Sequence, residues 1–117
     1  SPLLIAAVLC AGCATERMVP ATWPPGERAV VHADPAVSAG LPVQLRLRKV
    51  NGRKLPLTAS SVELPPGRHG LLVDCRVAAT DSVRRFTVDA LLEAGRNYRL
   101  VATASARNCE AVELVEQ

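Results

Sequence analysis

Aromatic residues are scarce in this sequence: one Trp, one Tyr and one Phe make up 3% of its 117 residues. Because aromatic rings bury the largest apolar areas, a folded core must be built mainly from Val, Leu and Ala. A chain of this length allows one small domain. A core this thin gains much of its stability from a covalent crosslink, if one is present.

An excess of one charge is also lacking. The 14 basic and 11 acidic residues are mixed along the chain, and the net charge is +3. This balance favours anionic partners slightly and falls far short of the basic footprint of a nucleic-acid-binding protein. We therefore expect no nucleic acid among the partners.

Long hydrophobic runs are missing as well. The apolar stretch at residues 3–9 is shorter than the roughly 20 residues that a membrane-spanning helix needs. It matches the hydrophobic region of a signal peptide, although no Met and no basic segment precede it. We expect the sequence to begin inside a signal peptide.

The motif "LCAGCAT" (residues 9–15) resembles a bacterial lipobox, with Ala11 and Gly12 before the cut and Cys13 as the acylated residue. Cys10 stands where the lipobox usually has Leu. The resemblance implies a signal remnant at residues 1–12 and three acyl chains (palmitate among them) on Cys13, which hold a protein stably on a membrane. Since Ala14 and not Asp follows, the family's sorting rule implies the outer membrane of a Gram-negative bacterium, with the domain facing the periplasm.

The spacing of Cys10 and Cys13 leaves three alternatives. An ordinary secretory signal needs no acylation. A redox CxxC opens a helix after a strand, and a zinc site needs two further ligands at suitable spacing. The sequence around residues 10–13 supplies neither context, so we favour the lipobox.

Two cysteines then remain, Cys75 and Cys109. In an oxidising compartment we expect them to form a disulfide, which would close a loop of roughly 35 residues and contribute about 3–4 kcal/mol. The alternative is two buried free thiols that act as small hydrophobic residues.

The segment before the domain has three prolines, the lone Trp23 and no periodicity. Residues 13–26 are therefore predicted to be the lipidated Cys and an extended tether, followed by the domain at residues 27–117. Trp23 is expected either at the lipid interface or packed on the domain.

The domain is predicted to be all β, a small antiparallel β-sandwich of about seven short strands. In "PVQLRLRKV" (42–50), Val43, Leu45 and Leu47 alternate with polar residues, which is typical of a half-buried strand. "NG" at 51–52 predicts a hairpin turn, and Pro56 limits the return strand. Further strands are expected at 27–34, 61–64, 83–92, 98–105 and 109–116, and in a longer strand whose inward face carries Leu71, Val73, Cys75 and Val77.

Two stretches resemble known families. "LLEAGRNYRLVATA" (91–104) resembles the turn of fibronectin- and immunoglobulin-like sandwiches, where the hydroxyl of a Tyr placed like Tyr98 bonds back to the backbone. "VNGRKLPLTASSVELPPGRHGLLVDC" (50–75) resembles the PEGA-like repeats of bacterial envelope proteins, and the body is similar to small proteobacterial outer-membrane lipoproteins. These are turn and core residues, so the resemblance implies a scaffold and no chemistry.

Residues that carry catalysis or bind metal are sparse. His32 and Asp34 offer two ligands with no visible third, and His69 sits in a turn motif. Neither a nucleophile motif nor a Gly-rich phosphate loop is present in the sequence. We expect no catalytic residues, no cofactor and no metal, and we do not expect an enzyme.

The arginines are the one positive signal. Because a guanidinium binds carboxylates and phosphates bidentately, we take as a candidate surface for anionic ligands Arg46, Arg48, Arg84 and Arg85, with Arg53 and Arg68 nearby. Lipid phosphates, lipopolysaccharide and peptidoglycan are the expected ligand classes. The alternative is a solvated sheet face with cross-strand ion pairs.

The sequence therefore predicts a lipid-anchored, periplasm-facing binding or structural module, held on the membrane through its N-terminal lipid. One alternative is an accessory subunit of an envelope assembly or transport machine, recruited through a strand edge. The other is a hydrolase-like or metal-dependent envelope enzyme.

Overall fold

A computed structural model describes residues 14–34, 36–38, 40–105 and 107–117. The predicted signal remnant (1–12) and the predicted acylation of Cys13 lie outside these residues. No helix in the described ranges is long and apolar enough to cross a membrane.

The described chain forms ten strands and one short 3₁₀ turn at Pro25–Glu27, so the expected count of about seven strands is too low. The strands are β1 (Ala14–Arg17), β2 (Ala29–His32), β3 (Ala36–Ser38), β4 (Leu41–Val50), β5 (Arg53–Lys54), β6 (Ala59–Leu64), β7 (Gly67–Val77), β8 (Ser82–Leu92), β9 (Asn97–Ala104) and β10 (Cys109–Glu116).

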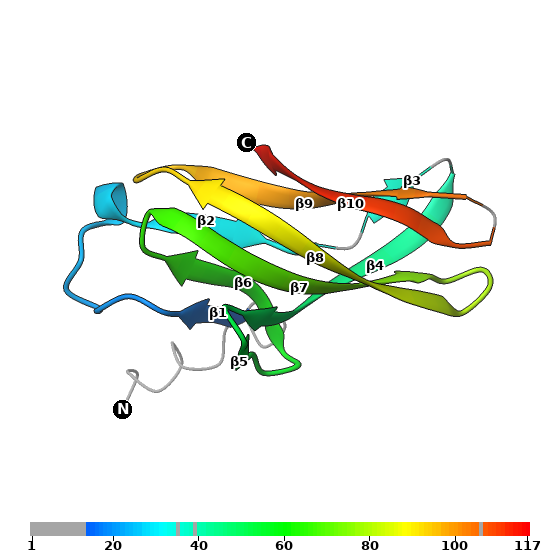
Figure 1. The fold of residues 1–117 in the computed structure, drawn as a ribbon, viewed down its shortest axis with the longest axis horizontal. Helices are drawn as coiled ribbons and strands as arrows, with labels where there is room; N and C mark the ends of the chain where they lie inside the picture. The colour runs from blue at the N-terminus through cyan, green and yellow to red at the C-terminus, as the bar shows by residue number, and fades with distance from the viewer. Residues whose placement is uncertain (1–13, 35, 39, 106) are drawn as a thin grey trace, which may run out of the picture.

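The strands form two sheets of five strands each (Figure 1). The first sheet has the order β1-β6-β2-β9-β10, and the second has the order β3-β4-β7-β8, with β5 paired to β4. Two pairs, β1 with β6 and β2 with β9, are parallel, and the others are antiparallel. The predicted all-β class is confirmed. The second sheet is antiparallel, as predicted, whereas the first sheet contains both parallel pairs.

The core lies between the two sheets and is made almost entirely of aliphatic side chains. On β4, Val43, Leu45 and Leu47 are buried, while Gln44 and Arg46 are exposed, as the alternation predicts. On β7 the predicted inward residues are all fully buried: Leu71, Val73, Cys75 and Val77. The period of two thus decides which face of each strand meets the core.

A disulfide joins the two sheets. Cys75 on β7 and Cys109 on β10 are bonded, with their Cα atoms 6.1 Å apart. The predicted crosslink is confirmed, and it closes a loop of 34 residues that connects one layer to the other.

The β4–β5 turn is the hairpin that the "NG" dipeptide predicts. Asn51 (φ 51°) and Gly52 (φ 80°) both adopt left-handed backbone conformations, which a two-residue turn of this kind requires. The return strand β5 has two residues. Beyond it, the N–H of buried Leu55 donates to the carbonyl of Arg48 on β4 at 2.9 Å and extends the pairing of the hairpin.

The tyrosine predicted to brace the 92–98 turn does so. The backbone N–H of Glu93 donates to the hydroxyl of Tyr98 at 2.8 Å, and the Tyr98 side chain is buried. Gly95 in this turn has φ 75°, and its N–H donates to the carbonyl of Arg28 at 2.9 Å. The turn is therefore locked to the segment that precedes β2.

The predicted tether is wrong for the residues that directly follow Cys13. Residues 14–17 form β1, an edge strand parallel to β6, and Arg17 pairs with Glu63 at 2.9 Å. The contact continues past β1, where the N–H of Met18 donates to the carbonyl of Glu63 and Val19 is buried. Because β6 offers a partner to this segment, the chain runs along the domain instead of lifting it away.

Candidate functional site

The polar face of the second sheet carries a group of arginines around one carboxylate. The strand register places Arg46 of β4 directly opposite Asp74 of β7, and Asp74 directly opposite Arg85 of β8. Arg48 of β4 also reaches Asp74. Three guanidinium groups, two from β4 and one from β8, therefore flank a single acid on the strand between them.

Asp74 is largely occupied by two of these arginines. The Nε of Arg85 lies 2.8 Å from Oδ1, and the Nη1 of Arg48 lies 3.4 Å from Oδ2. The hydrogen bond and the charge of Asp74 raise the pKa of Arg85 above its ordinary value. With three cations and one anion, the group keeps a local charge of about +2.

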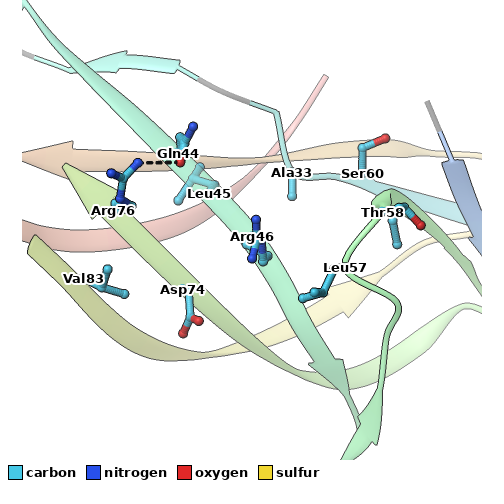
Figure 2. A pocket seen from close by; sticks show the side chains of 11 residues that line it. Ala33, Gln44, Leu45, Arg46, Leu57, Thr58, Ser60, Asp74, Arg76 and Val83 are labelled. Atoms are coloured by element: carbon cyan, nitrogen blue, oxygen red, sulfur yellow. Dashed lines mark hydrogen bonds between the residues drawn. The ribbon is translucent and has the colours of Figure 1, made fainter. Parts of the chain in front are cut away.

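Arg46 is the member of this group without an ion-pair partner among the described residues. It lines a groove of about 380 Å³, a volume within the range of small-ligand sites. Figure 2 shows the side chains around it, with Arg46 on β4 beside the loop that carries Leu57 and Thr58. Leu57 and Val83 provide apolar surface, while Thr58 and Ser60 add hydroxyl groups.

The groove also contains residues that the sequence interpretation missed. Arg76 lies on the same face as Asp74, and it pairs with Asp81 at 2.6 Å and donates to the Oε1 of Gln44 at 3.0 Å (Figure 2). The pattern of β7 carries the signal for both residues, because Asp74 and Arg76 alternate with the buried Val73 and Cys75.

Of the four predicted surface arginines, the structure brings together Arg46, Arg48 and Arg85 but not Arg84. Arg84 sits opposite Cys75 in the β7–β8 ladder, so it lies on the inner face of β8. Its Nη1 donates to the carbonyl of Cys109 at 3.0 Å, and its guanidinium stacks over the Phe86 ring at 5.3 Å. Consecutive strand residues point to opposite faces, so Arg84 and Arg85 never share one.

Neither of the two histidines lines the Arg46 groove, and His69 has a structural role. The Nε2 of His69 lies 2.7 Å from the carbonyl of Pro65, and Nδ1 lies 2.9 Å from the side-chain amide of Asn51, so the ring ties the β4–β5 turn to β7. His32 is half-buried on β2. Within the described ranges no group of three or more His, Cys, Asp or Glu residues is placed to hold a metal ion.

The fold and this groove define a small disulfide-linked protein of two β-sheets with a basic site on one outer face. No protein-family model matches the chain, and neither a curated protein nor a solved structure gives a significant match. The function must therefore be argued from the site itself.

Proposed function

We propose that this protein is a lipid-anchored, periplasm-facing β-sandwich module, of the PEGA- or immunoglobulin-like kind, that binds an anionic ligand in the Arg46 groove without catalysing a reaction. The observation that carries the proposal is the guanidinium of Arg46, which has no ion-pair partner in the described part of the chain and lines a groove of about 380 Å³. Since Arg48 and Arg85 already engage Asp74, that carboxylate leaves Arg46 available for an anion from outside.

The chemistry of the groove favours binding over catalysis. An arginine stays protonated at physiological pH, so it holds a carboxylate or phosphate but does not transfer protons. The apolar walls at Leu57 and Val83 suit a ligand that carries a hydrocarbon portion beside its acidic group. Acidic components of a bacterial envelope, such as lipopolysaccharide phosphates and peptidoglycan carboxylates, have this chemistry.

Two observations support an envelope location. The Cys75–Cys109 disulfide is of the kind that persists in oxidising compartments. The lipobox-like motif that ends at Cys13 supplies an anchor. Mass spectrometry of the mature protein tests the anchor, because the proposal requires an acylated Cys13 at the N-terminus. An unmodified Cys13 on a secreted chain would overturn the location.

The binding proposal is tested with purified peptidoglycan sacculi and, separately, lipopolysaccharide micelles. We expect Arg46→Gln to weaken binding to at least one of these probes about tenfold, the scale of one charge-assisted hydrogen-bonded pair. Arg99→Gln is the matched control, because Arg99 is also exposed and has no ion pair in the described part of the chain, but it lies on the first sheet. Equal binding by both variants, or no binding to either probe, would refute the proposal.

A second candidate is recruitment into a larger envelope assembly through a strand edge. β8 is the terminal strand of the second sheet, has 11 residues and carries the exposed Val83 and Leu91. Exposed edges of this length accept a further strand. In crosslinked envelopes, this candidate requires one stoichiometric partner that is lost with Leu91→Lys and kept with Arg46→Gln.

A further inference from the structure

We propose that residues 49–58, the basic hairpin, form a membrane-docking surface that lays the domain on anionic lipid headgroups beside its N-terminal attachment point. The inference builds on the proposed envelope location and adds an orientation to it. It shares Leu57 with the Arg46 groove, but Lys49 and Lys54 do not line that groove, so variants of the two lysines separate the two claims.

The basic hairpin concentrates cations that have no partner in the protein. Lys49 of β4 and Lys54 of β5, the only lysines of the chain, lie directly opposite each other and share one face of the hairpin, whereas Arg53, opposite Val50, is on the other face. All three cations are exposed, and none forms an ion pair with a described residue. Like charges directly opposite in a ladder destabilise it, so an external anionic surface would relieve their repulsion.

An exposed apolar side chain follows these cations three residues after Lys54. Leu57 is 67% exposed, the highest value among the exposed large hydrophobic residues of the described chain. Leu55 is buried and anchors the loop, and Pro56 separates it from Leu57. Cations that face phosphates while an apolar side chain enters the headgroup layer are typical of interfacial binding.

The position of β1 places this surface at the attachment point. Ala14 pairs with Ala59, two residues beyond Leu57, so the chain enters the domain beside the basic hairpin. An acyl chain on Cys13 would precede Ala14 with no spacer. The domain would then rest against the bilayer with this side toward it.

The opposite edge of the first sheet carries both signs of charge. β10, at the edge opposite β1, has Glu110, Glu113 and Glu116, but Arg96 pairs with Glu116 at 3.0 Å and Arg99 of β9 lies opposite Val115. Figure 1 shows β1 and β5 on one side of the molecule and β10 on the other. The proposed orientation therefore depends on the attraction between the basic hairpin and an anionic membrane.

The test uses the full chain with Cys13→Ser, which removes acylation, and flotation with phosphatidylcholine vesicles with or without about 30 mol% phosphatidylglycerol. We expect stronger binding to the anionic vesicles. Lys49→Gln with Lys54→Gln should weaken that binding on the order of 25-fold, because each basic residue near such a surface contributes about fivefold. The paired control, Arg99→Gln with Arg107→Gln, removes the same charge and should leave binding nearly unchanged.

The apolar part is tested in the same assay. Leu57→Ser should weaken binding about tenfold, whereas Leu91→Ser, which changes another exposed leucine on β8, should not. Residues 1–12 are present in every variant, so any contribution from them cancels. Raising the salt from about 0.15 M to about 1 M should release the protein, because the screening length falls from about 8 Å to about 3 Å.

The inference is overturned if the lysine pair and its control bind anionic vesicles equally, or if binding ignores both lipid charge and salt. Its failure is distinguishable from that of the proposed function. Arg46→Gln should reduce binding to sacculi while vesicle binding persists, and the lysine variant should lose vesicle binding while binding to sacculi persists.

Discussion

Cys75 on β7 and Cys109 on β10 form the covalent link between the two sheets, and both residues are fully buried. Replacing both with Ala should lower the free energy of unfolding by about 3–4 kcal/mol, because the unfolded chain regains the freedom of a 34-residue loop. Urea unfolding of the variant and of the oxidised wild type measures this difference, and the reduced wild type should resemble the variant. A loss below about 1 kcal/mol would contradict the expected contribution.

The ion pairs of Glu63 predict that the free energy of unfolding depends on pH in the acid range. Loss of hydration raises the pKa of Glu63, but hydrogen bonds and charge attraction from Arg17 and Arg28 outweigh it and leave the pKa below 4.5. A lowered folded-state pKa stabilises the protein above pH 4.5, and this stabilisation disappears as the pH falls through the folded-state value.

Glu63→Gln should therefore be less stable than the wild type at pH 7, by about 1 kcal/mol. Below pH 4.5 the difference should shrink, because the wild-type carboxyl becomes neutral as well. Thermal unfolding across this range checks it, with Glu113→Gln on exposed β10 as the control that should show no such trend. A gap that widens on acidification would show that Glu63 acts in another way.

Tyr98→Phe removes the hydroxyl that accepts the Glu93 N–H and keeps the buried ring. The expected loss is about 1 kcal/mol, the value of one neutral hydrogen bond. Hydrogen exchange at the Glu93 amide should speed up in the variant more than exchange at core amides of β7. If the Glu93 amide remained equally protected, another group would have to satisfy it.

Gly95→Ala tests whether the close packing of the 92–98 turn on the segment before β2 contributes to stability. A Cβ at this position would lie 3.2 Å from the carbonyl oxygen of Gly26, and the φ of 75° is itself unfavourable for Ala. Gly52→Ala is the matched control, with φ 80° and no atom within 4 Å of the new Cβ.

Both variants share the cost of a left-handed backbone, about 1–2 kcal/mol. Gly95→Ala should exceed Gly52→Ala by a further contact penalty, visible as a lower midpoint in urea unfolding. Equal midpoints would mean that the Gly26 segment moves aside freely.

Much of the fold could be predicted because its signals are local. Alternation in 42–50 identifies the buried face of β4, and the Asn51–Gly52 pair sets the hairpin, since few residues accept the backbone angles it needs. The turn around Tyr98 depends on residues within six positions of each other. These features follow from sequence spacing alone.

The candidate site was only partly predictable. Arg46 and Arg48 could be placed on one face of β4, but their meeting with Asp74 and Arg85 depends on the registers of three strands. The predicted surface is wrong for Arg84, which lies on the face opposite to that of Arg85, and the period of two along β8 already indicates this difference.

The sequence by itself determined which residues of β4 and β7 are buried and where the hairpin turns. Only the tertiary structure decided that residues 14–17 join a sheet and that Arg46 remains without an ion partner among the described residues. Backbone angles and side-chain alternation are local properties, so neighbouring residues are enough to predict them. The pairing of β1 is not local, because its partner strand lies more than 40 residues away, as the contact between Arg17 and Glu63, 46 positions apart, shows.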